Sequence, residues 1–194
     1  MRNSSKDGSC VVLGRFQPVH KGHAFLISEA NVWRLKNQEE SKLVIAVGST
    51  NKPQNLLNPW TFEERKVMLE ASISELEIDA EIIGIPDIDD PPNWVKHANK
   101  FHGENGVLFT SDGPTGDIYS DAGWDVIVIR PKNRDKLVGW RVRETMRMMS
   151  TIQDTDAVKS VLGESIQKSV IMSLIETGAL RRLAFMGEGG EPVG

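Results

Sequence analysis

Short apolar segments alternate with amphipathic segments along much of the chain. Five apolar runs rich in Val, Ile and Leu, each bounded by turn-forming residues, cover residues 11–13, 43–47, 81–85, 107–109 and 126–129. Such runs are typical of strands buried in a parallel sheet. Segments of helical character lie between them, at residues 21–35, 61–76 and 93–102. This alternation predicts an α/β fold: a single doubly wound, Rossmann-like parallel sheet of five strands, with helices on both faces.

Beyond the last predicted strand the pattern is helical only. Residues 139–149 and 165–177 are predicted helices, and Gly178 is a suitable stop for the second. Thr61 and Glu64 have the spacing of a capping box, which supports a helix start there.

The length of 194 residues suits one domain. We expect a Rossmann-like core over residues 10–136 and a C-terminal helical part of the same domain over residues 137–185. The polar stretch 1–9 and the glycine-rich stretch 187–194 are expected to be flexible tails.

Composition argues against nucleic acid and membrane as partners of this protein. The formal net charge of −4 gives the whole chain no electrostatic footprint for duplex nucleic acid. No apolar run approaches the length of a membrane span, and the polar N-terminus lacks the apolar core of a signal peptide. Cys10 is the only cysteine, which fits a reducing compartment. We therefore expect a cytoplasmic protein with neither nucleic acid nor membrane as partner.

One segment departs from this acidic balance. Between Arg130 and Arg147 the acids are only Asp135 and Glu144. The basic residues there are Arg130, Lys132, Arg134, Lys136, Arg141, Arg143 and Arg147. The cluster indicates a local anion site, and a solvated basic helix face is the alternative.

Candidate chemistry follows from the predicted sheet. Ligands of open parallel sheets bind beyond the carboxyl ends of the strands, where helices begin. Polar and charged residues gather in the segments that would lie there: residues 14–23, 48–51, 87–94, 110–113 and 130–143.

The first of these segments contains two histidines three residues apart. His20 and His23 would share a face of the first helical turn, while Gly14 and Gly22 allow close approach of a ligand. Two imidazoles at a helix N-terminus suit phosphate. An incomplete metal pair is the alternative, but no Cys, His or carboxylate cluster at suitable spacing completes a zinc site, so phosphate is favoured.

The wording "GRFQPVHKGH" resembles the H-x-G-H signature of the nucleotidyltransferase superfamily, and most closely the archaeal-type nicotinamide mononucleotide (NMN) adenylyltransferases. Further segments recur in the order of that family: "VGST", "NPWTFEERKVML", "PDIDDPPNWVKH" and a glycine-arginine element near Gly139. The resemblance extends over about residues 10–180.

The resemblance implies transfer of AMP from ATP to NMN by direct in-line displacement, giving NAD and pyrophosphate, with Mg²⁺ accompanying ATP. It places His20, His23 and Arg15 in catalytic roles. The implied ATP-binding residues are Gly14, Arg15, Phe16, His20, Gly22, His23, Arg130, Gly139 and Arg143. The implied NMN-binding residues are Gly48, Ser49, Asp87 and Trp94, with Trp60 as a weaker candidate. Family members often form homo-oligomers, including hexamers, so a homo-oligomer is expected.

Three positions differ from the family pattern. Val138 and Trp140 stand where serine and threonine are expected, and Leu57 stands where an arginine is often found. Lost hydroxyl and guanidinium donors would weaken contacts to ATP phosphates. Two alternatives therefore stay open: a related nucleotidyltransferase with another phosphorylated acceptor, and a catalytically weakened nucleotide-binding protein.

Overall fold

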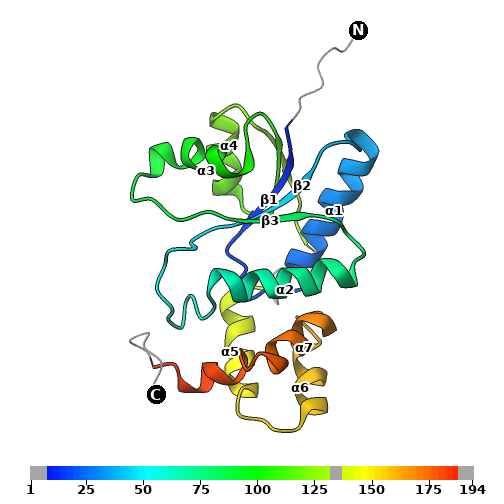
Figure 1. The fold of residues 1–194 in the computed structure, drawn as a ribbon, viewed down its shortest axis with the longest axis vertical. Helices are drawn as coiled ribbons and strands as arrows, with labels where there is room; N and C mark the ends of the chain where they lie inside the picture. The colour runs from blue at the N-terminus through cyan, green and yellow to red at the C-terminus, as the bar shows by residue number, and fades with distance from the viewer. Residues whose placement is uncertain (1–7, 132–136, 188–194) are drawn as a thin grey trace. The chain divides into compact units, whose positions relative to one another are not determined.

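Five parallel strands form the sheet in the computed structural model, which describes residues 8–131 and 137–187 (Figure 1). Their order is β3-β2-β1-β4-β5. Their bounds are β1 Cys10–Gly14, β2 Leu43–Val47, β3 Glu81–Gly84, β4 Val107–Thr110 and β5 Asp125–Val128. The central strand β1 pairs with β2 on one side and β4 on the other, so its carboxyl end lies at the point where the strand order reverses.

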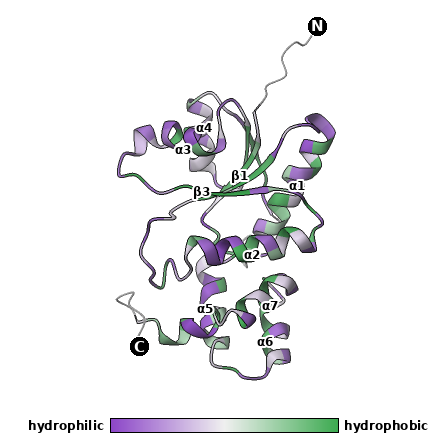
Figure 2. Cartoon of the chain, in the orientation of Figure 1, coloured by the Kyte–Doolittle hydropathy of each residue, from purple (hydrophilic) through white to green (hydrophobic). Residues whose placement is uncertain are grey.

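Helices cover both faces of this sheet, as the sequence predicts. One face packs on α3 (Trp94–His102) and α4 (Gly113–Asp121), and its buried cluster includes Val11 and Leu108 from the strands. The alternating side chains point to the other face, where Trp33 of α1 (Lys21–Asn37) lies edge-on to Phe109 at 5.4 Å between ring centroids. Figure 2 shows the apolar colouring of the strands. The doubly wound α/β prediction is confirmed.

The remaining helices belong to a second compact unit. By packing, the described residues divide into a sheet unit (residues 8–14, 25–50 and 78–131) and a helical unit (residues 15–24, 51–77 and 137–187). The helical unit contains α2 (Phe62–Glu75), α5 (Gly139–Met149), α6 (Thr155–Leu162), α7 (Lys168–Glu176) and a 3₁₀ helix η3 (Arg181–Phe185). The structure thus groups α2 and the segment after β1 with the C-terminal helices.

The helical unit is held by polar as well as apolar contacts. Ser72 of α2 donates to Gln167 at 2.5 Å, and Glu75 accepts from the backbone N–H of Ser169 at 2.9 Å. The start of α1 joins this unit because the Lys21 N–H donates to the Ser165 carbonyl at 2.8 Å. Buried apolar residues fill the interior, among them Met68, Leu69, Val142, Met146, Leu162, Val170, Ile171 and Leu174.

Helix ends follow the sequence signals. Thr61 and Glu64 form the predicted capping box at the start of α2. Gly178, with φ +71°, follows Thr177, the C-cap of α7, as the predicted stop. The helix expected over residues 93–102 begins one residue later, as α3, because a 3₁₀ turn η1 (Pro91–Asn93) with two consecutive prolines precedes it.

The predicted tails are described only at their inner ends. Gly8 is buried, and the Ser9 carbonyl accepts from the Val107 N–H at 3.1 Å, so the pairing with β4 continues at the amino end of β1. Residues 1–7 and 188–194 lie outside the described residues.

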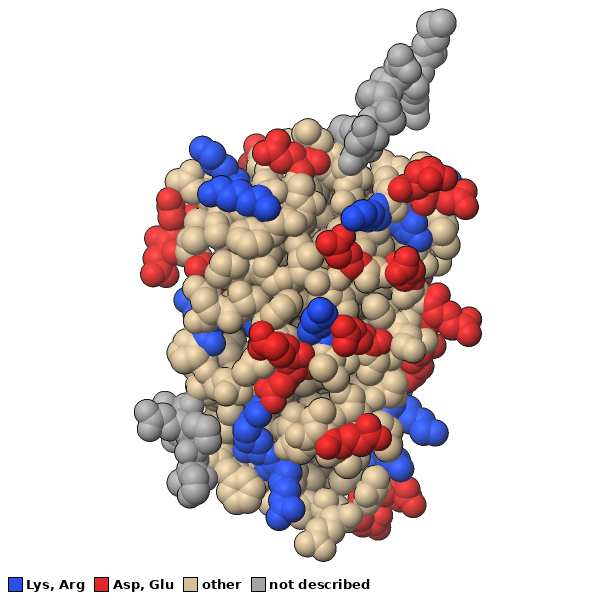
Figure 3. All heavy atoms as spheres, viewed as in Figure 1, with Lys and Arg blue, Asp and Glu red and all other residues tan. Residues whose placement is uncertain are grey.

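No helix within residues 8–131 and 137–187 combines the length and apolar character needed to cross a membrane. Acidic and basic side chains are interspersed over the face drawn in Figure 3.

Candidate functional site

The segment directly after β1 is attached to Trp60 by the buried side chain of Gln17, through two hydrogen bonds that we call the glutamine clasp. The side chain of Gln17 donates from Nε2 to the Trp60 carbonyl at 2.8 Å and accepts at Oε1 from the Trp60 N–H at 3.1 Å. Gln17 is only 6% exposed and Trp60 only 1%. Both backbone groups of Trp60 therefore depend on one amide, which fixes this segment against the residues preceding α2.

Two arginines hold the same segment through its carbonyl groups. Arg65 of α2, itself 2% exposed, donates to the Arg15 carbonyl at 2.9 Å and to the Thr61 carbonyl at 3.1 Å. Arg143 of α5 donates to the Gln17 carbonyl at 2.6 Å. The backbone between β1 and α1 is thus held from two helices.

His20 and His23 cap the start of α1 reciprocally. The Nδ1 of His20 accepts from the Gly22 N–H at 3.1 Å, and the Nδ1 of His23 accepts from the His20 N–H at 3.3 Å. This pairing resembles a capping box in which imidazoles replace the hydroxyl and carboxylate groups. The rings stack with centroids 3.8 Å apart, and Phe16 packs on His23 at 4.8 Å.

These bonds fix which nitrogens carry protons. An Nδ1 that accepts from a backbone amide is unprotonated, so the proton of each neutral ring lies on Nε2. Burial lowers the pKa of His20 to about 4. Burial, followed by the charge of His20, holds the pKa of His23 well below its ordinary value. At neutral pH the pair therefore presents two neutral Nε2–H donors.

Two arginines belong to the same unit as this pair. Burial, and then the nearby charge of Arg15, lower the pKa of Arg143. Arg15 itself is exposed. Two guanidinium groups close enough to repel each other are stabilised by an anion that both can reach. The helical unit thus combines two arginines with two imidazole donors.

Two glycines leave room for neighbouring side chains, Gly22 for His20 and Gly139 for Arg143. A Cβ on Gly22 would lie 3.0 Å from Cε1 and Nδ1 of the His20 ring. A Cβ on Gly139 would lie 3.4 Å from Nη1 of Arg143. The ring of His20 rests directly on the backbone of Gly22, so this position accommodates no larger residue without moving the ring.

Four of the residues expected to bind the acceptor, Gly48, Ser49, Asp87 and Trp94, belong to the sheet unit, whereas Trp60 belongs to the helical unit. Ser49, in the left-handed region with φ +56°, donates from Oγ to Oδ2 of Asp87 at 2.8 Å. Gly48 donates its N–H to the Gly14 carbonyl at 2.9 Å, joining the ends of β2 and β1. Trp94 begins α3, is partly buried, and packs against the cluster beneath that helix.

Two expected ATP-binding residues, Gly14 and Arg130, also belong to the sheet unit. Gly14 is the last residue of β1, and Arg130 follows β5. Of the basic cluster, Lys132, Arg134 and Lys136 lie outside the described residues. Within residues 8–131 and 137–187, no three His, Cys, Asp or Glu side chains converge as a metal site.

Comparison with known proteins assigns the family. The sequence profile described as Cytidylyltransferase-like matches residues 11–136, which contain all of the sheet but Cys10, and the histidine pair. The chain belongs to the Cytidylyltransferase-like family.

Relatives within this family carry a narrower name. A nicotinamide-nucleotide adenylyltransferase of Ignicoccus hospitalis is 29% identical over 173 residues, covering 88% of this chain and 92% of the relative. One of Haloarcula marismortui is 24% identical, covering 91% and 92%.

A solved structure also aligns with this chain. It is a bifunctional NMN adenylyltransferase/ADP ribose pyrophosphatase of Francisella tularensis, complexed with AMP and a manganese ion. The identity is 26% and the TM-score 0.62, over 91% of this chain and 51% of that one. This chain therefore spans about half the length of the solved protein.

Three residues differ from the family pattern. Two of them, Trp140 and Leu57, are exposed, and the third, Val138, stands at a helix start without capping it. Val138 is the N-cap of α5 and makes no side-chain cap. Trp140 is 52% exposed, with the guanidinium of Arg141 5.2 Å from its ring centroid. Leu57 is 65% exposed. The start of α5 thus lacks the hydroxyl groups expected from the family.

Other residues of the family motifs stabilise the segment before α2. Trp60 donates from Nε1 to the Ala179 carbonyl at 3.4 Å and is enclosed. Burial alone would raise the pKa of Glu64, but hydrogen bonds from Arg182 and Thr61 hold it below its ordinary value. The "NPWTFEER" block therefore anchors the segment before α2 to η3.

Sequence reasoning missed the roles of Gln17 and His97. Gln17 stands inside the motif, but a glutamine gives no periodic or spacing signal of a long-range clasp. His97 donates to the Pro86 carbonyl at 2.9 Å, and this contact depends on how α3 lies against the end of β3. Both contacts join segments separated in sequence, which no local pattern specifies.

Proposed function

We propose that this protein transfers the adenylyl group of ATP to NMN, forming NAD and pyrophosphate. The observation that carries the proposal is the imidazole pair of His20 and His23, whose Nδ1 atoms are occupied by backbone amides. The pair therefore offers two Nε2–H donors in the unit that also contains Arg15 and Arg143, a set suited to phosphate oxygens. The names of the relatives supply the acceptor.

In this reaction an oxygen of the NMN 5′-phosphate attacks the α-phosphorus of ATP. A new oxygen–phosphorus bond forms while the bond from that phosphorus to the bridging oxygen of pyrophosphate breaks, and pyrophosphate leaves with its electrons. No protein nucleophile is needed, so the protein aligns the reactants and stabilises developing charge. His20 and His23 would donate to phosphate oxygens, with Arg15 and Arg143 neutralising their charge.

Further ATP contacts would come from backbone and ring surfaces. Gly14, Gly22 and Gly139 would allow close approach of the nucleotide, Phe16 would support the ring of His23, and Arg130 would add charge. Mg²⁺ would enter with ATP, held mainly by phosphate oxygens and water, as its octahedral preference favours. The solved relative with AMP and manganese supports a divalent ion in this family.

The acceptor would bind to the sheet unit. Trp94 would offer its ring to the cationic pyridinium of NMN, and Asp87, oriented by Ser49, would bind the carboxamide. Gly48 would leave room beside them, since a Cβ there meets only the Gly14 carbonyl, at 3.9 Å. Trp60 would contribute by supporting the neighbouring backbone, since it is enclosed.

The direct test uses purified protein with ATP, Mg²⁺ and NMN. We expect equal amounts of NAD and pyrophosphate, measured by enzymatic reduction of NAD and by a phosphate assay after pyrophosphatase treatment. His23→Ala removes one donor and should lower kcat by roughly 100-fold or more. Glu176→Ala, at the exposed end of α7, is the control and should retain activity. Absence of NAD above the His23→Ala level overturns the proposal.

A second candidate is a nucleotide-binding protein with little turnover. It is favoured by Val138 and Trp140, which leave the start of α5 without hydroxyl donors. Calorimetric titration with ATP separates the two functions: saturable binding without NAD formation supports this candidate, and robust turnover excludes it. Replacement of NMN by other phosphorylated acceptors in the pyrophosphate assay tests the related enzyme with another acceptor.

A further inference from the structure

His97 joins the two halves of the candidate acceptor site. It lies one helical turn after Trp94 in α3, and its Nε2–H donates to the Pro86 carbonyl at 2.9 Å. Pro86 directly precedes Asp87. One side chain therefore spans from the helix that carries Trp94 to the segment that carries Asp87.

The hydrogen bond from His97 orients more than the Pro86 carbonyl itself. The peptide group between Pro86 and Asp87 is planar, so a bond that holds the Pro86 oxygen also fixes the direction of the Asp87 N–H. The carboxylate of Asp87 is held separately by Ser49 at 2.8 Å. Backbone and side chain of Asp87 are thus oriented by different partners.

Ring packing fixes the imidazole itself. The ring of His97 lies 5.8 Å from that of Trp94 and 5.1 Å from that of Phe101. Its rotamer is therefore coupled to the position of the Trp94 indole. A carbonyl can only accept, so Nε2 carries the proton in this contact.

We propose that His97 is a positioning residue that sets the spacing and orientation of Asp87 relative to Trp94 for the nicotinamide ring of the acceptor. This inference rests on the proposed function. His97 acts through Pro86 and Trp94, without touching ATP. Loss of the contact should therefore weaken acceptor binding selectively.

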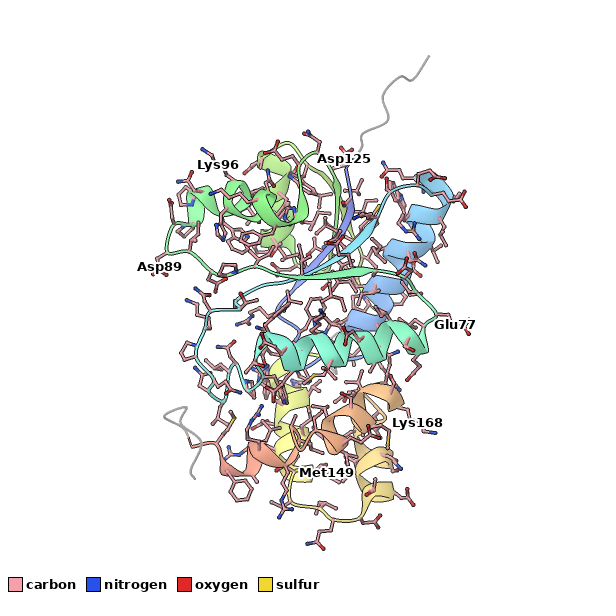
Figure 4. The ribbon with its side chains drawn as sticks, viewed as in Figure 1. Glu77, Asp89, Lys96, Asp125, Met149 and Lys168 are labelled. Carbon is pink, nitrogen blue, oxygen red and sulfur yellow. The ribbon has the colours of Figure 1, made fainter. Side chains whose placement is uncertain are left out.

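The test compares three substitutions at this position. His97→Ala removes ring and donor, His97→Phe keeps ring packing without the donor, and His97→Gln keeps a donor of similar reach. Lys96→Ala is the matched control, because Lys96 is exposed on the same helix and projects away from it (Figure 4). Circular dichroism establishes that each variant is folded.

We expect His97→Ala and His97→Phe to raise KM for NMN about 10-fold while KM for ATP changes less than about 2-fold. His97→Gln should have a KM for NMN close to that of the wild type. Equal changes in both KM values, or a His97→Phe variant like the wild type, overturn the inference.

Calorimetric titration with NMN separates this inference from the proposed function. If the wild type binds NMN without turnover, the proposed catalysis fails, and the affinities of the His97 variants still decide the positioning role. If the wild type turns over but the variants show no selective loss, the positioning role alone fails. If the wild type neither binds nor converts NMN, both are overturned.

Discussion

The ring of His20 rests on a residue without a side chain. Gly22 donates its N–H to Nδ1 of His20, and a Cβ at this position would lie 3.0 Å from two atoms of the ring. That separation is shorter than ordinary carbon contacts, so either the ring or the helix start must shift. In the proposed function the imidazole that caps α1 also donates to phosphate, so a shift of the ring would change both contacts.

Gly22→Ala should lower kcat by roughly 10–100-fold, because misplacement of a donor by a fraction of an ångström is costly. The midpoint of thermal unfolding should change little, since alanine favours the helix and offsets part of the strain. Steady-state kinetics and calorimetry measure the two effects. Ser160→Ala, at an exposed position of α6, is the control. Equal kinetics for the two variants would contradict the expected displacement.

At the scale of elements, the glutamine clasp joins the segment after β1 to the start of α2. Gln17→Ala leaves the N–H and carbonyl of Trp60 without their partner in a buried place. We expect the free energy of unfolding of the helical unit to fall by about 2–4 kcal/mol. Urea unfolding followed by circular dichroism measures it. Gln153→Ala, at an exposed site, should change it by less than about 0.5 kcal/mol. A similar loss in both variants rejects the clasp as the cause.

The sequence predicted most elements but missed two helices. The strands and the long helices could be predicted because the apolar residues that they bury recur regularly in the sequence. In β2, for example, every position is apolar and buried. Helix α4 was missed because "GPTGDIYSD" opens like a turn, and Asp112 starts it by accepting from the Thr115 N–H at 3.0 Å. Helix α6 is eight residues long, too short for a convincing period.

The candidate site was predictable only in part. The spacing of His20 and His23 predicted adjacent rings, which the structure contains. The direction of each imidazole was not predictable, because it depends on backbone amides that exist only once α1 begins. The grouping of α2 with the C-terminal helices was likewise absent from local patterns, since it arises from long-range contacts such as Ser72 to Gln167.

At the scale of the whole molecule, buried neutral histidines make stability depend on pH. Burial lowers the pKa of His20 from 6.5 to about 4 and also lowers the pKa of His102, whose Nε2 accepts from the Tyr119 hydroxyl. The unfolded chain takes up protons as pH falls through about 6.5, whereas the folded chain resists until about pH 4. Stability is therefore fully present above the unfolded pKa and is lost as pH falls through this window.

For His20 alone, the free energy of unfolding should fall by about 2 kcal/mol between about pH 7 and about pH 5. Urea unfolding of the wild type and of a His20 variant at the two pH values measures this contribution as the difference between their pH dependences. His20→Asn keeps a capping acceptor without a titrating group, so its pH dependence should be shallower. A residual slope from His23 and His102 is expected in that variant, because burial lowers the pKa of both. An unchanged slope in His20→Asn would show that other groups govern the acid sensitivity.

The clasp at Gln17 has a consequence for how this gene can vary. Glutamine and glutamate codons differ only at their first base, so glutamate is a single-nucleotide neighbour of this position. The substitution would replace the nitrogen that donates to the Trp60 carbonyl by a charged oxygen, and the two oxygens would repel in a buried setting. A readily available mutation is thus one of the least tolerable, and purifying selection at this codon should be directed against it.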